Sequence, residues 1–348
     1  MIEVAGKYHY SGAIHMHTTE SDGTVSLEQL AAIGHESGLD YMMVTDHMNV
    51  NNRTAGKEGI YGKTLVVIGY EHNDTDDIHH YLIFQSPQVY PHTMTPREYV
   101  AAAAKDGALG IIAHPDEIRD RMKNYPPYPW KDWGAVGFNG IEIWNQMSEW
   151  MERLTPYNKL FMAFSPRKSM IGPTDRVRAK WDELAAQGKC LGIAAVDAHA
   201  FPIPVGPFIV RIFPYKVHFK SLRTVVILDK PFASDFAKAS KQLYDSLRNC
   251  RAYCANLRWG DADGFDFWAE SPNGRAGIGE SIQLSTDMRL HAILPAKAQM
   301  RLVQNGRTIT EIIGRDFSLP IVTPGVYRLE AWRGDRGWIF SNHITVGV

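Results

Sequence analysis

Short apolar runs alternate with longer helix-compatible stretches through residues 1–268 of the chain. This order is typical of repeated strand and helix units that build a mainly parallel sheet. We therefore expect an α/β domain at 1–268, with strands at 13–17, 41–45, 64–69, 81–84, 109–113, 140–144 and 191–196.

Two of the stretches between these strands carry the end signals of helices. Ser26 is a suitable N-cap for a helix over 26–37, which Gly38 would end. Pro96 takes a first-turn position in a second helix over 95–106, and Gly107 follows its end. Helices are expected in most of the other gaps.

The pattern changes after Ala269. The segment SPNGRAGIGES is rich in turn residues, and beyond it apolar positions alternate with period two. Asn305-Gly306 predicts a two-residue hairpin, and Gly334 to Gly337 separates a second pair of strands. We predict a small immunoglobulin-like β-sandwich domain at 269–348.

Composition excludes several classes of protein. The 37 Lys and Arg residues almost cancel the 38 Asp and Glu residues, so no global field attracts nucleic acid or an anionic membrane. The segment MIEVAGKYHYSG lacks the features of a signal peptide, and no apolar run approaches the roughly 18 residues of a membrane span. We expect a cytoplasmic protein. Its 3 cysteines lack metal-finger spacing and are expected to be buried or idle thiols.

Metal-ligand residue types stand at or near the C-terminal ends of five predicted strands. His15 and His17 are two residues apart, and in a strand such residues point to the same face. In barrels of alternating strands and helices, the strand ends share one face, where active sites lie. The sequence therefore predicts a polynuclear metal centre, because the other strands run into Asp46-His47, Glu71, His114 and Asp197-Ala198-His199.

Two further residues can reach the same centre: Asp22, in the turn Ser21-Asp22-Gly23, and His80, at the start of HYLIF. A lone His at a strand end is more often a hydrogen-bonded structural residue, and Ser-Asp-Gly is usually only a turn. Five coincident cases favour ligation. His72 and His79 compete with His80. The other histidines are interpreted as ordinary surface or helix residues: His9, His35, His92, His218, His291 and His343.

These motifs resemble, in order, those of the polymerase and histidinol phosphatase (PHP) domain. The family's motifs correspond here to His15-Met16-His17 with Ser21-Asp22-Gly23, Thr45-Asp46-His47, Glu71 with His80, Ala113-His114-Pro115, and Asp197-Ala198-His199. The resemblance implies a distorted seven-stranded βα barrel, similar to a TIM barrel. It also implies nine ligands to three metals: His15, His17, Asp22, His47, Glu71, His80, His114, Asp197 and His199.

The resemblance covers nearly the whole chain. The segments GIEIWN, LRNCRAYCANLRW and VYRLEAWRGDRGWIFSNHITV resemble the branch of PHP hydrolases that includes carbaryl hydrolase, which cleaves a carbamate ester. That branch often ends its last hairpin with Asn-Pro, where this chain has Asn342-His343.

Imidazole and carboxylate ligands without thiolate suit zinc, manganese or iron. With two or three such ions, a metal-bridging hydroxide is the expected nucleophile and Glu71 the expected bridging carboxylate. Asp46 is expected to accept a hydrogen bond that orients an imidazole. Candidates for substrate contacts, each also readable as a solvated or structural residue, are Arg53, Lys57, Arg119 and Asn145.

The leading functional hypothesis is hydrolysis of a small phosphate ester, which most of the wider PHP family performs. The alternative is cleavage of a neutral carbamate, ester or amide, which needs apolar walls. Residues that could line such a pocket or simply form core are Tyr125, Tyr128, Trp130, Trp133, Trp144 and Trp150. A third hypothesis is a non-catalytic binding protein. No nucleotide-binding fingerprint or basic stripe is present, so we expect a small-molecule substrate rather than polymeric nucleic acid, and leave the oligomeric state open.

Overall fold

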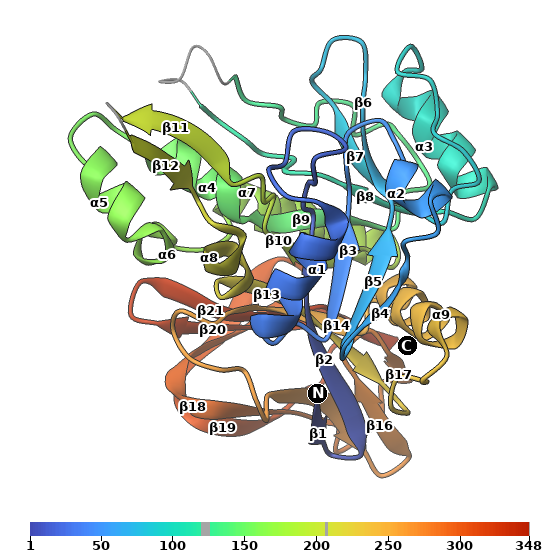
Figure 1. Cartoon of the computed structure of the whole chain (residues 1–348). Coiled ribbons are helices and arrows are strands. Elements are labelled where there is room, and N and C mark those ends of the chain that lie inside the picture. The colour runs from blue at the N-terminus through green and yellow to red at the C-terminus, as the bar shows by residue number, and fades with distance from the viewer. Residues whose placement is uncertain (120–125, 206–207, 348) are drawn as a thin grey trace. The chain divides into compact units, whose positions relative to one another are not determined.

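The computed structural model describes residues 1–119, 126–205 and 208–347 (Figure 1). The chain divides into two compact units. The histidine-rich unit comprises Gly12–Met170 and Ala194–Arg223, and the β-rich unit comprises Met1–Ser11, Ile171–Ile193 and Thr224–Val348. A domain boundary between residues 268 and 269 stays a prediction. Three strands have residues in both units: β2 (Lys7–Ile14), β10 (Leu191–Ala195) and β13 (Leu222–Leu228).

The histidine-rich unit contains the apolar strands expected from the sequence. They are β3 (Tyr41–Val44), β5 (Thr64–Ile68), β7 (His80–Phe84), β8 (Leu109–Ile112) and β9 (Gly140–Asn145). Every residue of these strands is buried, as continuous apolar runs with both faces covered should be. Four further strands were not predicted from the sequence: β4 (Gly59–Tyr61), β6 (Tyr70–Asn73), β11 (Phe201–Val205) and β12 (Phe208–Ile212).

Strand pairing in this unit is mixed, so the expectation of a mainly parallel sheet is wrong. The end of β2 pairs in parallel with β3, and β3 with β5. In a second sheet, β7 is antiparallel to both β6 and β8, whereas β8 and β9 are parallel. The link from β6 to β7 is too short for a parallel crossover, which needs a dozen or more residues. A closed seven-stranded barrel stays a prediction.

Both predicted helices of this unit are confirmed. Helix α1 (Leu27–Glu36) begins with a capping box, in which Ser26 Oγ accepts from Gln29 N at 3.4 Å. Helix α3 (Pro96–Lys105) has Pro96 in its first turn, and the Glu98 carboxylate accepts from Thr95 N at 2.8 Å. The other helices of the unit are α2 (Asn51–Thr54), α4 (Gln146–Arg153), α5 (Lys159–Phe164), α6 (Pro166–Ser169) and α8 (Tyr215–Phe219).

The β-rich unit contains the two predicted hairpins. Strands β18 (Arg289–Gln304) and β19 (Arg307–Pro320) meet at Asn305-Gly306, whose φ angles of 48° and 77° suit a type I′ turn. Strands β20 (Gly325–Arg333) and β21 (Arg336–Ser341) form the second. The remaining elements are α7 (Asp175–Gln187), α9 (Phe236–Arg248), β1 (Ile2–Val4), β14 (Ala252–Asn256), β15 (Asp266–Ser271), β16 (Gly274–Gly277), β17 (Ser281–Gln283) and β22 (Ile344–Gly347).

The core of the β-rich unit consists of aromatic and aliphatic side chains from these strands, among them Phe267, Tyr327 and Trp338, which are fully buried. A separate β-sandwich stays a prediction. Beside this core, His343 Nε2 lies 2.7 Å from Asp182 Oδ1, and Arg328 donates to both oxygens of the same carboxylate.

Three of the histidines set aside in the sequence are buried rather than on the surface. They are His9, His218 and His343, and only His218 lies on a helix. The surface interpretation was wrong for His9 and His343 because both stand in or beside strands whose neighbours cover them. All three cysteines are buried and free, as predicted. No helix in the described part of the chain is long and apolar enough to cross a membrane.

Candidate metal centre

Eight of the nine side chains expected as ligands stand in or directly after strands, and Asp22 stands in the loop between β2 and α1. His15 and His17 follow β2, His47 follows β3, His114 follows β8, and Asp197 and His199 follow β10. Glu71 stands in β6 and His80 begins β7. Because β7 runs antiparallel to β8, its first residue lies at the edge where β8 ends. This pairing explains why a residue at a strand start joins residues at strand ends.

The donor atoms of these residues gather in four overlapping groups, in each of which all atoms lie within 4.8 Å of one another. The structure thus brings all nine together. The groups are His17, Asp22, His47 and His199; His15, His17 and Glu71; His15, His114 and Asp197; and Glu71, His80 and His114.

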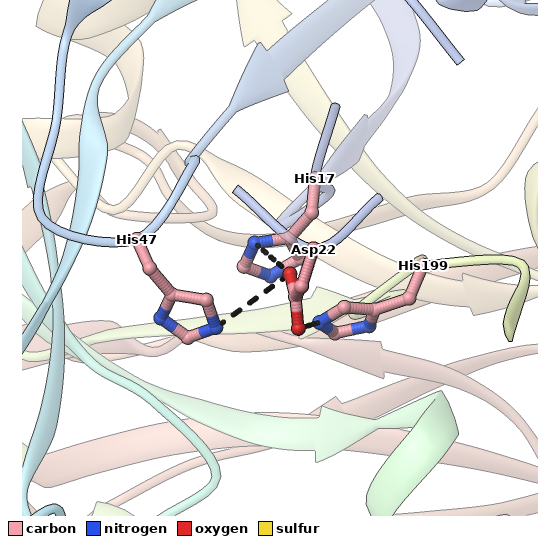
Figure 2. A group of neighbouring side chains, drawn as sticks. All are labelled: His17, Asp22, His47 and His199. Atoms are coloured by element: carbon pink, nitrogen blue, oxygen red, sulfur yellow. Dashed lines mark ion pairs between the residues drawn. The ribbon is translucent and has the colours of Figure 1, made fainter. Parts of the chain in front are cut away.

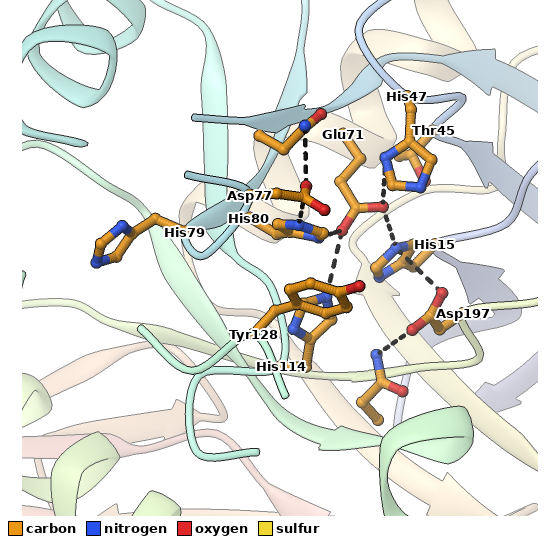
Figure 3. Close-up of polar contacts among 12 residues, drawn as sticks. His15, Thr45, His47, Glu71, Asp77, His79, His80, His114, Tyr128 and Asp197 are labelled. Atoms are coloured by element: carbon orange, nitrogen blue, oxygen red, sulfur yellow. Dashed lines mark hydrogen bonds and ion pairs between the residues drawn. The ribbon is translucent and has the colours of Figure 1, made fainter. Parts of the chain in front are cut away.

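Glu71 is the centre of the arrangement (Figure 3). Its Oε2 lies 2.9 Å from His15 Nε2 and 3.5 Å from His47 Nδ1. Its Oε1 lies 2.8 Å from His80 Nδ1 and 3.2 Å from His114 Nε2. Because the two oxygens face different imidazoles, this carboxylate can serve two cations at once.

Asp22 gathers a second set of imidazoles, and Figure 2 shows three rings turned toward its carboxylate. The shortest contact joins Asp22 Oδ2 to His199 Nε2 at 3.3 Å, and Oδ1 lies 3.6 Å from His17 Nδ1. Asp197 Oδ1 lies 3.5 Å from both His15 Nε2 and His199 Nδ1. The carboxylates therefore alternate with imidazoles through the cluster.

His17 gives the most direct test of whether this site fits metal ions. Its side chain is fully buried, yet neither ring nitrogen has a hydrogen-bond partner among the described residues. Burial, helped by the neighbouring His199, lowers the pKa of His17 to about 3, so the ring is neutral and keeps a lone pair. Buried polar atoms without partners are rare in proteins. A cation bound to a ring nitrogen of His17 would supply the missing partner, and the imidazole and carboxylate donors fit divalent metals.

Charge in the cluster also favours a cation. Burial alone would raise the pKa values of Glu71 and Asp197, but the surrounding imidazoles hold both well below the usual range. Burial likewise opposes the charged form of His80, yet Glu71 and Asp77 raise its pKa to about 10. Ionised carboxylates therefore stand in a buried site that attracts positive charge.

Three of the nine residues have left-handed backbone conformations: His15 (φ 69°), His114 (φ 27°) and Asp197 (φ 49°). Such conformations are unfavourable by about 1–2 kcal/mol for residues with a Cβ, and they concentrate at functional sites. The expectation that His15 and His17 share the face of a strand is wrong in detail, since β2 ends at Ile14. The left-handed backbone at His15 comes directly after the last residue of β2.

Glu142 is a residue of this site that the sequence analysis missed. It is buried in β9, and its Oε1 lies 2.6 Å from His15 Nδ1. Its Oε2 accepts from His114 N and from Asn145 Nδ2, both at 2.8 Å. The available signal was an acidic residue inside an otherwise apolar strand. Asn145, predicted as a substrate contact, instead holds Glu142 and caps α4 by accepting from Ser148 N at 3.0 Å.

Asp46 fixes the loop that carries Asp22 rather than an imidazole. Its carboxylate accepts from Thr18 N and Thr18 Oγ1 at 2.7 Å and from Ser21 Oγ at 2.8 Å. The expected hydrogen bond to a ring is absent among the described contacts of Asp46. Because its oxygens accept from Thr18 and Ser21, Asp46 holds the loop that follows His17 and contains Asp22.

A cavity of about 520 Å³ opens onto the cluster. Among the predicted cations, only Arg119 lines it in the described part of the chain, and Arg119 Nη2 donates to the buried Glu117. Arg53 instead donates to the Ser86 carbonyl oxygen at 2.8 Å, and Lys57 lies 3.1 Å from Glu28. An apolar part of the lining comes from Met147, Met151 and Phe201.

The competing histidines and most of the aromatic insert lie outside the cluster. His79 Nδ1 lies 2.6 Å from Asp74 Oδ2, and the ring of His72 packs on Tyr99 at 4.2 Å. Neither belongs to a donor group among the described residues. Tyr128 lines the cavity, Trp133 does not, and Tyr125 lies outside the described residues. The remaining aromatic residues of the insert are buried: Trp130, Trp144 and Trp150.

No protein-family model matches this chain, and no curated protein matches it. Among solved structures, it is similar to a two-domain protein containing a predicted PHP-like metal-dependent phosphoesterase from Bacteroides vulgatus. The identity is 12%, the overlap covers 99% of this chain and 97% of that chain, and the TM-score is 0.48.

Two further structures show looser similarity. One, from Bifidobacterium adolescentis, is named a "putative metal-dependent phosphoesterase" (15% identity, 59% of this chain and 93% of that chain, TM-score 0.35). The other is an amidohydrolase from Chromobacterium violaceum with bound sulfate and no metal (11% identity, 54% and 87%, TM-score 0.31). All three TM-scores are below 0.5, so the chemistry proposed for this site rests on its own side chains.

Proposed function

We propose that the protein is a metal-dependent hydrolase that cleaves a small phosphate ester. One observation carries this proposal: nine imidazole and carboxylate side chains converge around Glu71, and one of them, the buried His17, has no hydrogen-bond partner for either ring nitrogen among the described residues. A structural cluster of hydrogen-bonded histidines would satisfy that ring. A polynuclear metal centre accounts for both the convergence and the unpartnered nitrogens.

Two or three divalent ions, of manganese, zinc or iron, would be held by the nine residues of the four donor groups. When bound, such ions supply Lewis acidity, which lowers the pKa of water and neutralises charge on an ester. Glu71 would bridge through its two oxygens. Glu142 keeps the proton of His15 on Nδ1, which leaves the Nε2 lone pair directed into the cluster. Asp46 holds the loop in which Asp22 stands.

The cavity contributes substrate contacts of two kinds. Arg119 lies beside the donor cluster as an ion pair with Glu117, and its Nε, which has no hydrogen-bond partner among the described residues, is a donor for an oxygen of an ester such as a phosphate. Met147, Met151 and Phe201 form an apolar portion, which favours the second candidate, cleavage of a neutral carbamate, ester or amide. We favour the phosphate ester because its non-bridging oxygens carry negative charge. Metal ions in the site, with the adjacent guanidinium, would neutralise that charge.

The test compares turnover of nitrophenyl phosphate and of an aryl methylcarbamate by manganese-loaded protein, with His15→Ala and Asp197→Ala as controls. Phosphate turnover that both variants lose supports the proposal. Turnover of the carbamate alone assigns the second candidate. Full activity of Asp197→Ala on either substrate contradicts a metal-dependent mechanism at this site.

The proposal includes a distorted seven-stranded barrel in residues 1–268, a β-sandwich in 269–348, a cytoplasmic location of the protein and a small-molecule substrate. A chain truncated near Ala269 tests the role of the C-terminal part. If the truncated protein stays monodisperse and active, residues 269–348 are dispensable for catalysis. Loss of solubility would show that those residues complete the fold, and an intact fold without activity would point to a binding role.

A further inference from the structure

The cavity beside the metal-ligand cluster contains several hydrogen-bond donors, most of which are already engaged. Asn73 Nδ2 donates to Asp77 Oδ1 at 3.0 Å. Arg119 Nη2 donates to Glu117, and Nη1 lies 3.1 Å from Met151 Sδ. Arg119 Nε and His114 Nδ1 have no hydrogen-bond partner among the described residues. The hydroxyl of Tyr128, which lines the same cavity, also makes no hydrogen bond to the part of the chain that the structure describes.

Tyr128 is held firmly by the rest of its atoms. Its backbone N donates to Glu117 Oε2 at 2.8 Å, and Glu117 in turn accepts from Ser148 Oγ. Its ring stacks on His80 with centroids 4.7 Å apart and planes at 16°. The guanidinium carbon of Arg119 lies 5.3 Å from the ring centroid. Backbone, ring face and neighbouring charge therefore fix the phenol without using its hydroxyl.

The position of the ring places the hydroxyl near the donor cluster. Tyr128 lies against His80, and its ring centroid is 6.4 Å from that of His114. Figure 3 shows its hydroxyl end directed toward the part of the cluster that holds Glu71 and His15. An uncommitted donor on a rigid ring next to the reacting group is the arrangement that stabilises developing negative charge, because it needs no reorganisation during the reaction.

We propose that Tyr128 is a catalytic residue whose hydroxyl donates a hydrogen bond to an oxygen of the ester group bound at the cluster. The inference rests on the proposed function, since it requires an ester at the metal centre. It adds a direct contact that the metal ligands do not supply. Because Glu117 already compensates the charge of Arg119, the phenol adds a neutral hydroxyl donor to the cavity.

The test uses Tyr128→Phe, which keeps the ring on His80 and under Arg119 and removes only the hydroxyl. We expect kcat to fall about 100-fold, as for loss of one preorganised donor, with unchanged metal content. The matched control is Tyr157→Phe, because Tyr157 is fully exposed and its hydroxyl should not matter. Tyr128→Ala completes the series. Wild-type kcat in Tyr128→Phe, with a defect only in Tyr128→Ala, would overturn the proposal in favour of a stacking role.

Binding of inorganic phosphate to the manganese-loaded proteins, measured by calorimetry, gives a readout that does not depend on turnover. We expect about 10-fold weaker binding by Tyr128→Phe than by wild type. Equal binding and equal turnover would overturn the role of Tyr128 while the proposed function stands. If wild type cleaves only the carbamate, the phosphate ester fails, and a loss of carbamate turnover in Tyr128→Phe still supports Tyr128. Wild type that neither binds phosphate nor cleaves either ester overturns both.

Discussion

Replacing Glu142 with glutamine should weaken metal binding without unfolding the protein. The substitution keeps the size of the side chain and removes its charge. In the protein as it stands, one carboxylate oxygen faces His15 Nδ1 at 2.6 Å, and the other accepts from His114 N and Asn145 Nδ2. A glutamine offers one acceptor oxygen and one NH₂ group. Its NH₂ must therefore face either the His15 Nδ1–H or the donors of His114 and Asn145.

The expected size of the effect follows from these contacts. A hydrogen bond to a charged group contributes about 1.5–3 kcal/mol, and loss of a carboxylate that orients a ligating His weakens metal affinity about 10- to 100-fold. These two ranges agree, since each tenfold change in affinity corresponds to about 1.4 kcal/mol. We therefore expect the dissociation constant of the metal ion held by His15 to rise about 10- to 100-fold in Glu142→Gln.

The assay is competition for zinc or manganese against a chromophoric chelator at fixed pH, with circular dichroism to verify the fold. Glu58→Gln is the matched control, because Glu58 also accepts a backbone N–H, from Ile68 at 2.8 Å, but is in none of the donor groups of the described residues. Unchanged metal affinity in a folded Glu142→Gln variant would refute the reasoning. An equal loss in Glu58→Gln would show that the effect is not specific to His15.

Four further predictions concern metal, ligand and stability. Dialysis against a chelator should abolish ester hydrolysis, and added manganese, zinc or iron should restore it; activity that survives in metal-free protein would contradict the account. His17→Ala should lower the metal content, measured by mass spectrometry, whereas His79→Ala, which removes a partner of Asp74 outside the cluster, should not. Asp182→Ala should reduce the free energy of unfolding in urea by about 3 kcal/mol, because Arg328, 2% exposed, would keep only Glu330 as a charge partner among the described residues; a change below 1 kcal/mol would refute this. Burial opposes ionisation of Asp182, but Arg328 and His343 lower its pKa from 3.8 to about 2, so this stabilisation is present above pH 4 and is lost as pH falls toward 2. This pKa shift corresponds to about 2 kcal/mol of pH-dependent stability. In Asp182→Asn, the fall in the free energy of unfolding between pH 4 and pH 2 should be smaller by about that amount.

The part of the site that the sequence predicts well depends on local order along the chain. His47, His114, Asp197 and His199 each follow an apolar run, and strand ends can be located from such runs alone. Helix ends were predictable for the same reason, since Ser26 and Pro96 act within one turn of the chain. The hairpin at Asn305-Gly306 likewise depends on two adjacent residues.

The parts that were missed depend on which strands become neighbours. The pairing of β9 with β8 places the carboxylate of Glu142 beside His15 and His114. No local sequence pattern predicts that pairing. The direction of β7 follows from a short connection to β6, a strand too polar to be recognised. Arg53 was predicted as a substrate contact from its place after a strand, but its side chain reaches the Ser86 carbonyl instead.

Metal analysis of the purified protein tests the central claim most directly. Wild type and His17→Ala are each incubated separately with manganese, zinc or iron and then dialysed. The number of metal ions per chain is measured by inductively coupled plasma mass spectrometry. The account predicts two or three ions per chain in wild type for at least one metal and fewer in the variant. Less than one ion per chain in folded wild type with every metal would contradict it.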